Sequence, residues 1–173
     1  YFFEPKIFDF IPARKSYDFG KQVFPELVRG RLPFYGYAIG SAYWCDIGSH
    51  LHYRQAHWEL LEGRSGLRIP GREIRPHVWA GEDVEISPQA YIRPPVLLGP
   101  GCRIAAEAQL QGLLVLGPNV VVSPGAVVRS SVIWDHCQVG RDAVVEDCLV
   151  GSGCHLNSGQ RYAKMVVASG ARV

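Results

Sequence analysis

Residues 98–128 read LGPGCRIAAEAQLQGLLVLGPNVVVSPGAVV, and an apolar residue stands at every sixth position of this stretch, from Leu98 to Val128. The spacing extends back to Ile74 and forward to Val173, with fourteen intervals of six residues and three of five. A small or apolar residue follows four positions after most of these residues, and Gly, Pro, Ser and Asn crowd the places between them.

A period of six fits neither a helix, which needs apolar residues three and four apart, nor a single strand, which needs alternation. It fits a short strand and a turn, repeated, with one side chain pointing inward per repeat, as in a solenoid. The pattern resembles the left-handed parallel β-helix of the hexapeptide-repeat proteins, in which three hexapeptides complete one triangular coil. This resemblance supplies the handedness. We therefore predict a mainly β fold with this β-helix over residues 67–173, and tight corners at the three five-residue intervals.

Composition agrees with a folded domain that binds neither nucleic acid nor membrane. The chain has 173 residues, 47% of them hydrophobic, a net charge of +2 and scattered Lys and Arg residues. No apolar run reaches the length of a membrane-spanning helix, and no signal peptide is recognisable. Three of the five cysteines, Cys102, Cys137 and Cys154, fall in the small inward slot of the repeat. We expect free buried thiols in the reducing cytoplasm.

Residues 1–66 lack the period and indicate α/β organisation. We expect a helix that Asp18 caps and Gly30 closes, and a second helix that begins after Ser49 and ends at Gly63. The second helix has an apolar face of Leu51, Tyr53, Ala56, Leu60 and Leu61. Strands are predicted at the N-terminus before Pro5, at residues 34–39 and at residues 42–46. Residues 63–71 form the predicted linker into the β-helix.

Several short motifs follow one another in this first region. They are Phe3-Glu4-Pro5, Ser16-Tyr17-Asp18-Phe19-Gly20-Lys21, Tyr35-Gly36-Tyr37, Tyr43-Trp44-Cys45-Asp46-Ile47-Gly48 and Tyr53-Arg54-Gln55-Ala56. In this order they resemble the end of the catalytic domain of sugar-phosphate nucleotidyltransferases, most closely the mannose-1-phosphate guanylyltransferase type, in which a hexapeptide β-helix follows. The resemblance implies that residues 1–66 are the C-terminal remnant of an α/β nucleotidyltransferase domain.

The resemblance also implies a reaction. A sugar 1-phosphate attacks the α-phosphorus of a nucleoside triphosphate, which gives a nucleotide-sugar and pyrophosphate; GTP and mannose 1-phosphate, giving GDP-mannose, are the favoured pair. Mg²⁺ suits this chemistry because it is held by one or two carboxylates together with phosphates. The family's Trp-x-Asp-x-Gly segment makes Asp46 the predicted catalytic metal ligand. Considered locally, Asp46 could instead cap the helix that begins near Ser49.

Other polar residues have structural interpretations. Asp18 is expected to cap a helix, Tyr43 and Trp44 to pack beneath the site, and Arg14 with Lys15 to form a charged loop pair. The three helical histidines, His50, His52 and His57, are expected on a solvated surface.

The sequence contains no counterpart of the family's glycine-rich nucleotide-binding loop, its first metal-binding aspartate or its Glu-Lys pair. We therefore predict that this chain alone is inactive and that it forms a homo-oligomer through the β-helix. Nucleotide and sugar choice lie outside these residues. One alternative is a hexapeptide-repeat acyltransferase with a histidine base, for which His77, His136 and His155 are candidates. The other is a non-catalytic assembly or regulatory module.

Overall fold

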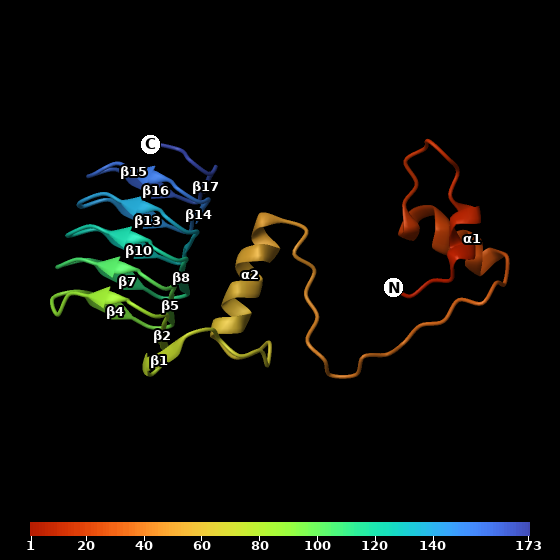
Figure 1. The fold of residues 1–173 in the computed structure, drawn as a ribbon, viewed down its shortest axis with the longest axis horizontal. Helices are drawn as coiled ribbons and strands as arrows, with labels where there is room; N and C mark the ends of the chain where they lie inside the picture. Colours follow the sequence, from red (N-terminus) through yellow and green to blue (C-terminus); the bar gives the residue numbers. More distant parts are fainter. The chain divides into compact units, whose positions relative to one another are not determined.

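The repeats wind into a parallel β-solenoid of about five turns in the computed structural model, which describes residues 1–173 (Figure 1). The solenoid has three faces, here called sheets A, B and C. Sheet A contains β1 (Arg72–Arg75), β2 (Val78–Ala80), β5 (Val96–Leu98), β8 (Leu114–Leu116), β11 (Val132–Ile133), β14 (Leu149–Val150) and β17 (Val166–Val167). Sheet B contains β3 (Glu85–Ile86), β6 (Arg103–Ile104), β9 (Val121–Val122), β12 (Gln138–Val139) and β15 (His155–Leu156). Sheet C contains β4 (Tyr91–Arg93), β7 (Gln109–Gln111), β10 (Val127–Arg129), β13 (Val144–Glu146) and β16 (Arg161–Ala163). The predicted parallel β-helix is confirmed; only the β1–β2 pair is antiparallel.

Strand register explains the irregular intervals in the sequence. Leu110 lies beside Val128 at a separation of 18 residues, whereas Val128 lies beside Val145 at a separation of 17. All three five-residue intervals fall at the corner between sheets C and A, where Ser130, Asp147 and Lys164 have φ values of 46°, 54° and 55°. Left-handed turn residues stand at these corners, as they do at corners within six-residue intervals such as those of Gly112 and Asn119. The predicted tight corners are confirmed.

Inward side chains stack into one continuous core. Leu98, Leu110 and Leu116 are fully buried or nearly so, as are the equivalent residues of the other coils. The predicted buried thiols Cys102, Cys137 and Cys154 are confirmed, and Cys148 at the corner between sheets C and A is buried as well. Burial raises the pKa of Cys102 and of Cys137 to about 11.

The chain divides by packing into two compact units, Tyr1–Ala42 and Tyr43–Val173. The first unit contains η1 (Pro5–Phe10), the π-helix η2 (Phe19–Val23) and α1 (Phe24–Arg29) around Ile7, Val23 and Leu27. Asp18 accepts a hydrogen bond from the Lys21 backbone N–H at 2.8 Å, so its predicted capping role is confirmed. Gly30 closes α1 as expected. The predicted domain boundary at residues 66 and 67 stays a prediction.

The strands predicted before Pro5, at residues 34–39 and at residues 42–46 are wrong. No backbone ladder involves these residues, and the chain through them is irregular. A strand is stable only beside a hydrogen-bonded neighbour, and none of the described residues pairs with these segments. Aromatic residues that favour strands stack on one another instead, as Phe3 does on Phe19 with ring centroids 5.0 Å apart.

Helix α2 (His50–Leu61) is the longest helix of the chain, with 12 residues. The Ser49 hydroxyl accepts from the His52 backbone N–H at 3.2 Å, and Gly63 follows the last turn with φ 73°. The predicted limits of this helix are confirmed. No helix of the chain has both the length and the apolarity needed to cross a membrane.

Candidate functional site

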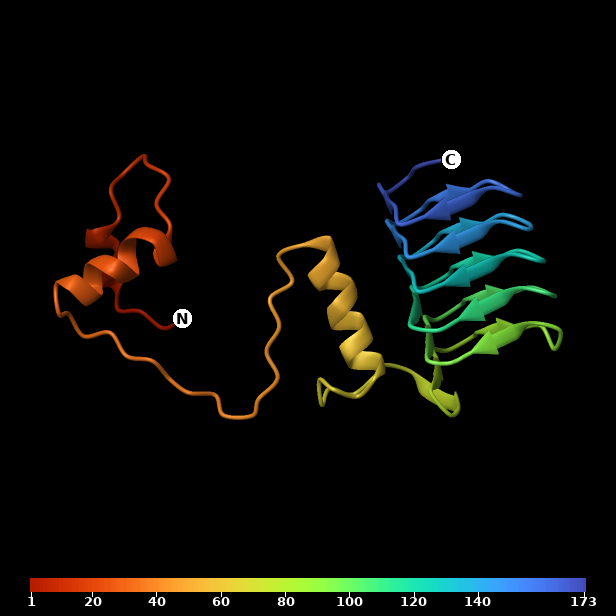
Figure 2. The same cartoon turned by 180° about the vertical axis from the view of Figure 1, so that it is seen from behind.

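Helix α2 lies against the outer face of sheet A, beside the stacked strands β5, β8, β11 and β14 (Figure 2). Leu61 is buried there, and Tyr53 packs on the same cluster. The sheet contributes an outward row of apolar residues to this contact: Leu97, Val115, Val132 and Leu149. Leu51, predicted on the apolar face, is 66% exposed because it precedes the part of the helix that reaches the sheet. The contact makes α2 part of the solenoid unit.

Two polar side chains of α2 anchor it to backbone groups of the solenoid. The Arg54 guanidinium donates to the Asp147 carbonyl oxygen at 2.8 Å and pairs with the Asp147 carboxylate at 3.2 Å. Trp58 Nε1 donates to the Leu113 carbonyl oxygen at 3.1 Å, and the Arg54 guanidinium lies 4.7 Å from the centre of the Trp58 ring. Some carbonyl oxygens at the solenoid corners have no backbone N–H partner within the solenoid. Arg54 and Trp58 supply hydrogen-bond donors to two of these oxygens.

The segment Tyr43–Gly48, which carries Asp46, is held to α2 at both ends. The Tyr43 hydroxyl donates to the Glu59 carboxylate at 2.6 Å, late in the helix. At the other end the chain runs directly into Ser49, the helix cap. The Tyr43 hydrogen bond is the main cause of a lowered Glu59 pKa, and it raises the pKa of Tyr43. Both pKa shifts keep the Tyr43 phenol neutral and the Glu59 carboxylate charged, which is the combination that forms this hydrogen bond.

Asp46 is exposed, and its carboxylate makes no hydrogen bond or ion pair within the chain. The alternative capping role is therefore wrong, because Ser49 performs it. A free carboxylate is a suitable donor for a hard cation such as Mg²⁺, which takes one or two carboxylates and completes its shell with water and phosphate oxygens. No cluster of three or more His, Cys, Asp or Glu side chains stands ready to hold a metal ion. Asp46 could therefore contribute one oxygen ligand, and the described residues do not form a metal site by themselves.

Among the other helical and aromatic candidates, two lie where expected and two do not. Trp44 is 73% exposed, so the prediction that its side chain packs beneath a site is wrong. His50 and His52 are exposed as expected. His57 is half-buried, with its ring 4.6 Å from that of Tyr53, and burial lowers its pKa; the predicted solvated position is wrong. Docking of α2 on the sheet, which the sequence did not indicate, covers it.

Arg14 and Lys15 are exposed in the loop between η1 and η2, where Arg14 has a φ of 60°, and neither side chain forms an ion pair. The position agrees with the expected charged pair in a loop, and both residues belong to the unit Tyr1–Ala42.

The solenoid histidines do not form a common site. His77, His136 and His155 are all exposed, in the corner before β2, the corner before β12 and strand β15. His136 Nε2 lies 3.8 Å from the Asp135 carboxylate, whose pKa is lowered chiefly by a hydrogen bond from the Ser152 hydroxyl. The coils run from β2 to β17 without a protruding loop.

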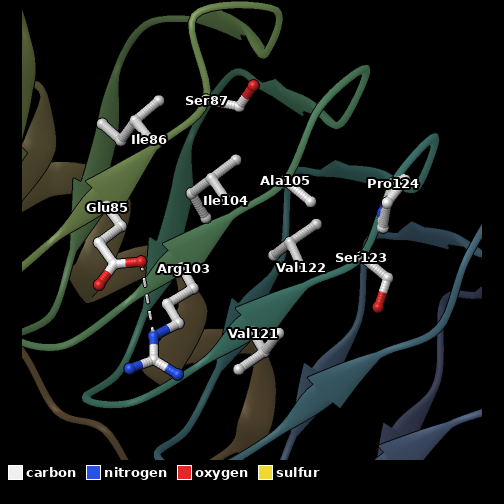
Figure 3. Close-up of a pocket in the computed structure, with 10 residues that line it drawn as sticks. All are labelled: Glu85, Ile86, Ser87, Arg103, Ile104, Ala105, Val121, Val122, Ser123 and Pro124. Carbon is white, nitrogen blue, oxygen red and sulfur yellow. Dashed lines mark ion pairs between the residues drawn. The ribbon is translucent and has the colours of Figure 1, made fainter.

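An open groove of about 470 Å³ runs across sheet B over β3, β6 and β9 (Figure 3). Its apolar lining includes the partly exposed residues Ala105, Val121 and Pro124, and its charged groups are Glu85 and Arg103, 3.7 Å apart. Both charged side chains are largely exposed, and the other polar side chains of the groove are the hydroxyls of Ser87 and Ser123, so the groove contains no buried charged group.

Comparison with known proteins matches both parts of the chain. Residues 1–63 match the Nucleotidyl transferase family profile, and residues 92–173 match the profile described as the GMPPB C-terminal domain. A UTP–glucose-1-phosphate uridylyltransferase from Synechocystis sp. is 37% identical over 158 residues, which cover 87% of this chain and 39% of that protein. The chain belongs to the sugar-phosphate nucleotidyltransferase family. It spans about two fifths of the length of that relative.

Two solved structures that match are weakly similar. The acetyltransferase domain of PglB from Neisseria gonorrhoeae matches with a TM-score of 0.39 at 14% identity, over 69% of this chain and 58% of that one. The same domain in complex with acetyl coenzyme A matches with a TM-score of 0.36 at 13% identity, over 69% and 62%. Similarity this low says nothing about the chemistry of this chain.

Helix α2 belongs to the nucleotidyltransferase match by sequence and to the solenoid unit by packing. The residues responsible for this dual position, Arg54, Trp58 and Glu59, were missed from the sequence. A partial signal existed, because Arg54 and Trp58 are four residues apart on one helical face. Their partners Asp147 and Leu113 are too distant in the sequence for that spacing to identify them.

Proposed function

We propose that this chain is the C-terminal part of a sugar-1-phosphate nucleotidyltransferase that makes a nucleotide-sugar and pyrophosphate. The observation that carries the proposal is the nucleotidyltransferase match over residues 1–63, within which Asp46 presents an exposed and unpaired carboxylate. Bound Mg²⁺ would neutralise phosphate charge and stabilise the pyrophosphate leaving group. Asp46 supplies one oxygen ligand to that ion, and Tyr43 and Ser49 keep the segment that carries it on helix α2.

GTP and mannose 1-phosphate are the favoured substrates. The match of residues 92–173 to the GMPPB C-terminal domain supports this pair. The Synechocystis relative is named for UTP and glucose 1-phosphate, which are the competing pair. The cytoplasmic location expected from the free cysteines remains part of the same proposal.

The experiment is pyrophosphate release by the longest natural polypeptide that contains this sequence. It is run with Mg²⁺ over four nucleoside triphosphates and several sugar 1-phosphates, for the wild type, Asp46→Ala and the control Glu82→Gln. Glu82 is exposed at a solenoid corner, with no side-chain partner. We expect kcat/KM to fall on the order of 100-fold or more in Asp46→Ala and to stay unchanged in the control, since loss of even a residue behind a metal ligand costs about 10- to 100-fold. Equal activity of Asp46→Ala and wild type would refute the metal role, and the most active substrate pair would decide specificity.

The solenoid is proposed to join copies of the chain into a homo-oligomer. Within the unit Tyr43–Val173 the helix α2 covers sheet A, and the last coil exposes Met165, Val166 and Val173. Light scattering of the 173-residue chain is expected to give a mass above one protomer; a monomer at all concentrations would exclude assembly through these residues. The chain alone is expected to release no pyrophosphate from any substrate pair, and detectable turnover would contradict this.

A further inference from the structure

Helix α2 bonds to the solenoid through some side chains and to the Asp46 segment through others. Arg54 and Trp58 reach the solenoid, while Glu59 holds Tyr43. Arg54 and Trp58 are four residues apart, and Glu59 directly follows Trp58 in the last turns of the same helix. A helix transmits displacement along its length because each turn is hydrogen-bonded to the next. The two sets of contacts are therefore mechanically connected.

At the solenoid, this connection is made by Arg54, whose side chain is mostly buried. The side chain of Arg54 is only 18% exposed, and Nε of its guanidinium is buried without a hydrogen-bond partner. The guanidinium makes two contacts with Asp147, one to the backbone carbonyl oxygen and one to the carboxylate of that residue. Such paired contacts fix orientation as well as distance. Asp147 is itself held in a tight corner with a φ of 54°, so the anchor point is rigid.

The other end restrains the Asp46 segment. Glu59 accepts from Tyr43 at 2.6 Å, and the Gln55 side-chain amide donates to the same carboxylate at 2.9 Å. Gln55 and Arg64, 3.7 Å away, therefore keep Glu59 oriented toward Tyr43. Asp46 lies three residues beyond Tyr43 and three before the Ser49 cap, so both ends of its segment move with α2.

We propose that the solenoid positions Asp46 through α2, with Arg54 as the residue that couples the two. Resting on the proposed function, this makes Arg54 and Tyr43 positioning residues for the metal ligand, and it gives the solenoid a role in the reaction besides assembly. Loss of the Arg54–Asp147 contact loosens the Asp46 segment although neither residue touches substrate or metal.

Cys45 allows a test that does not depend on activity. It is the neighbour of Asp46 and the only thiol of the chain that is not buried. Its rate of reaction with a chromogenic aromatic disulfide reports how freely the Asp46 segment moves. In the 173-residue chain we expect the rate to rise about 3- to 10-fold in Arg54→Ala, because local opening becomes easier once a restraint is lost. The rise should be smaller in Asp147→Ala, which keeps the bond from Arg54 to the Asp147 carbonyl oxygen. The Asp147 variant acts from the solenoid side, so it separates loosening of the segment from disruption of the helix.

Arg161→Ala is the matched control. Arg161 pairs with Glu146 at 2.8 Å on sheet C and does not contact α2. Its substitution removes an arginine–carboxylate pair from the same solenoid and should leave the Cys45 rate unchanged. Unchanged Cys45 rates in Arg54→Ala and Asp147→Ala, with the circular dichroism of the native chain, would overturn the proposal.

The second measurement is the Mg²⁺ dependence of pyrophosphate release by the longest natural polypeptide. Arg54→Ala and Tyr43→Phe should raise the half-saturating Mg²⁺ concentration several-fold and largely retain kcat at saturating Mg²⁺. A purely structural role would lower the amount of active protein and leave the half-saturating concentration unchanged; that result would also overturn the proposal. Altered Cys45 rates in a polypeptide that releases no pyrophosphate from any substrate pair would support the mechanical coupling and refute the proposed function alone.

Discussion

Replacement of Gly99 by alanine tests how closely the solenoid coils approach one another. A Cβ atom at Gly99 would lie 2.5 Å from the carbonyl carbon of Gly117 and 2.6 Å from the nitrogen of Pro118. Both are backbone atoms of the next coil, so no side chain can rotate away. Ordinary contact begins near 3.4 Å, so the two coils must separate by roughly 0.9 Å at this corner, in an interior that is normally close-packed.

The magnitude follows from the bonds that this separation lengthens. Gly99 N–H donates to Leu116 at 2.7 Å, and Asn119 N–H donates to Pro100 at 2.8 Å. Lengthened by that amount, neither contact remains a hydrogen bond. Two lost bonds cost about 2 kcal/mol, and residual overpacking adds about 1 kcal/mol. We expect Gly99→Ala to lower the free energy of unfolding by roughly 3 kcal/mol.

Gly112→Ala is the matched control. Gly112 occupies another solenoid corner, no atom lies within 4 Å of its Cβ position, and its φ is 60°. The left-handed conformation costs an alanine about 1 kcal/mol. Both variants stiffen the unfolded chain equally, so that contribution cancels in the comparison.

The assay is guanidinium denaturation followed by far-ultraviolet circular dichroism, with linear extrapolation to water. Gly99→Ala should be less stable than Gly112→Ala by about 2 kcal/mol, from the difference between the two estimates above. A Gly99→Ala chain as stable as Gly112→Ala would show that the coils yield at no cost, and the close-approach reasoning would be wrong.

Further predictions concern the core, the helix and the thiols. Leu110→Ala, in the fully buried stack, should cost about 3 to 5 kcal/mol in the same denaturation assay; a loss below 1 kcal/mol would contradict its burial. His57 has a lowered pKa, so its protonation favours the unfolded chain: stability should be full above pH 6.5 and fall as the pH drops through that value, and His57→Gln should remove this part of the dependence. One thiol, that of Cys45, should react rapidly at pH 8 in the native chain and five in denaturant; two or more rapid native thiols would argue against the buried core.

Local sequence was sufficient for the solenoid because each coil repeats the same short-range requirement. An inward apolar residue every six positions and turn residues between them are visible without knowledge of any distant partner. The slot of Cys137 and the tight corner at Ser130 followed from the same periodicity. The helix caps Asp18 and Ser49 were equally predictable, because a cap bonds to a backbone group three residues away.

The strands expected at residues 34–39 and 42–46 failed for the opposite reason. Their composition favours an extended chain, but a strand is stable only beside a neighbouring strand. The residues of a segment do not show whether such a neighbour is present. The burial of His57 and the exposure of Leu51 were missed in the same way, because both depend on where α2 meets the sheet.

The sequence by itself therefore determined the solenoid, the helix limits and, through its motifs, the family to which the chain belongs. It also singled out Asp46, whose metal role awaits the activity measurement. Only the tertiary structure decided that α2, within the nucleotidyltransferase match, packs on the solenoid, since the Arg54–Asp147 contact joins residues 93 positions apart. Periodicity and helix caps depend on residues that are close together in the sequence. A docking contact depends on two surfaces that are far apart in the sequence, and only folding brings them together.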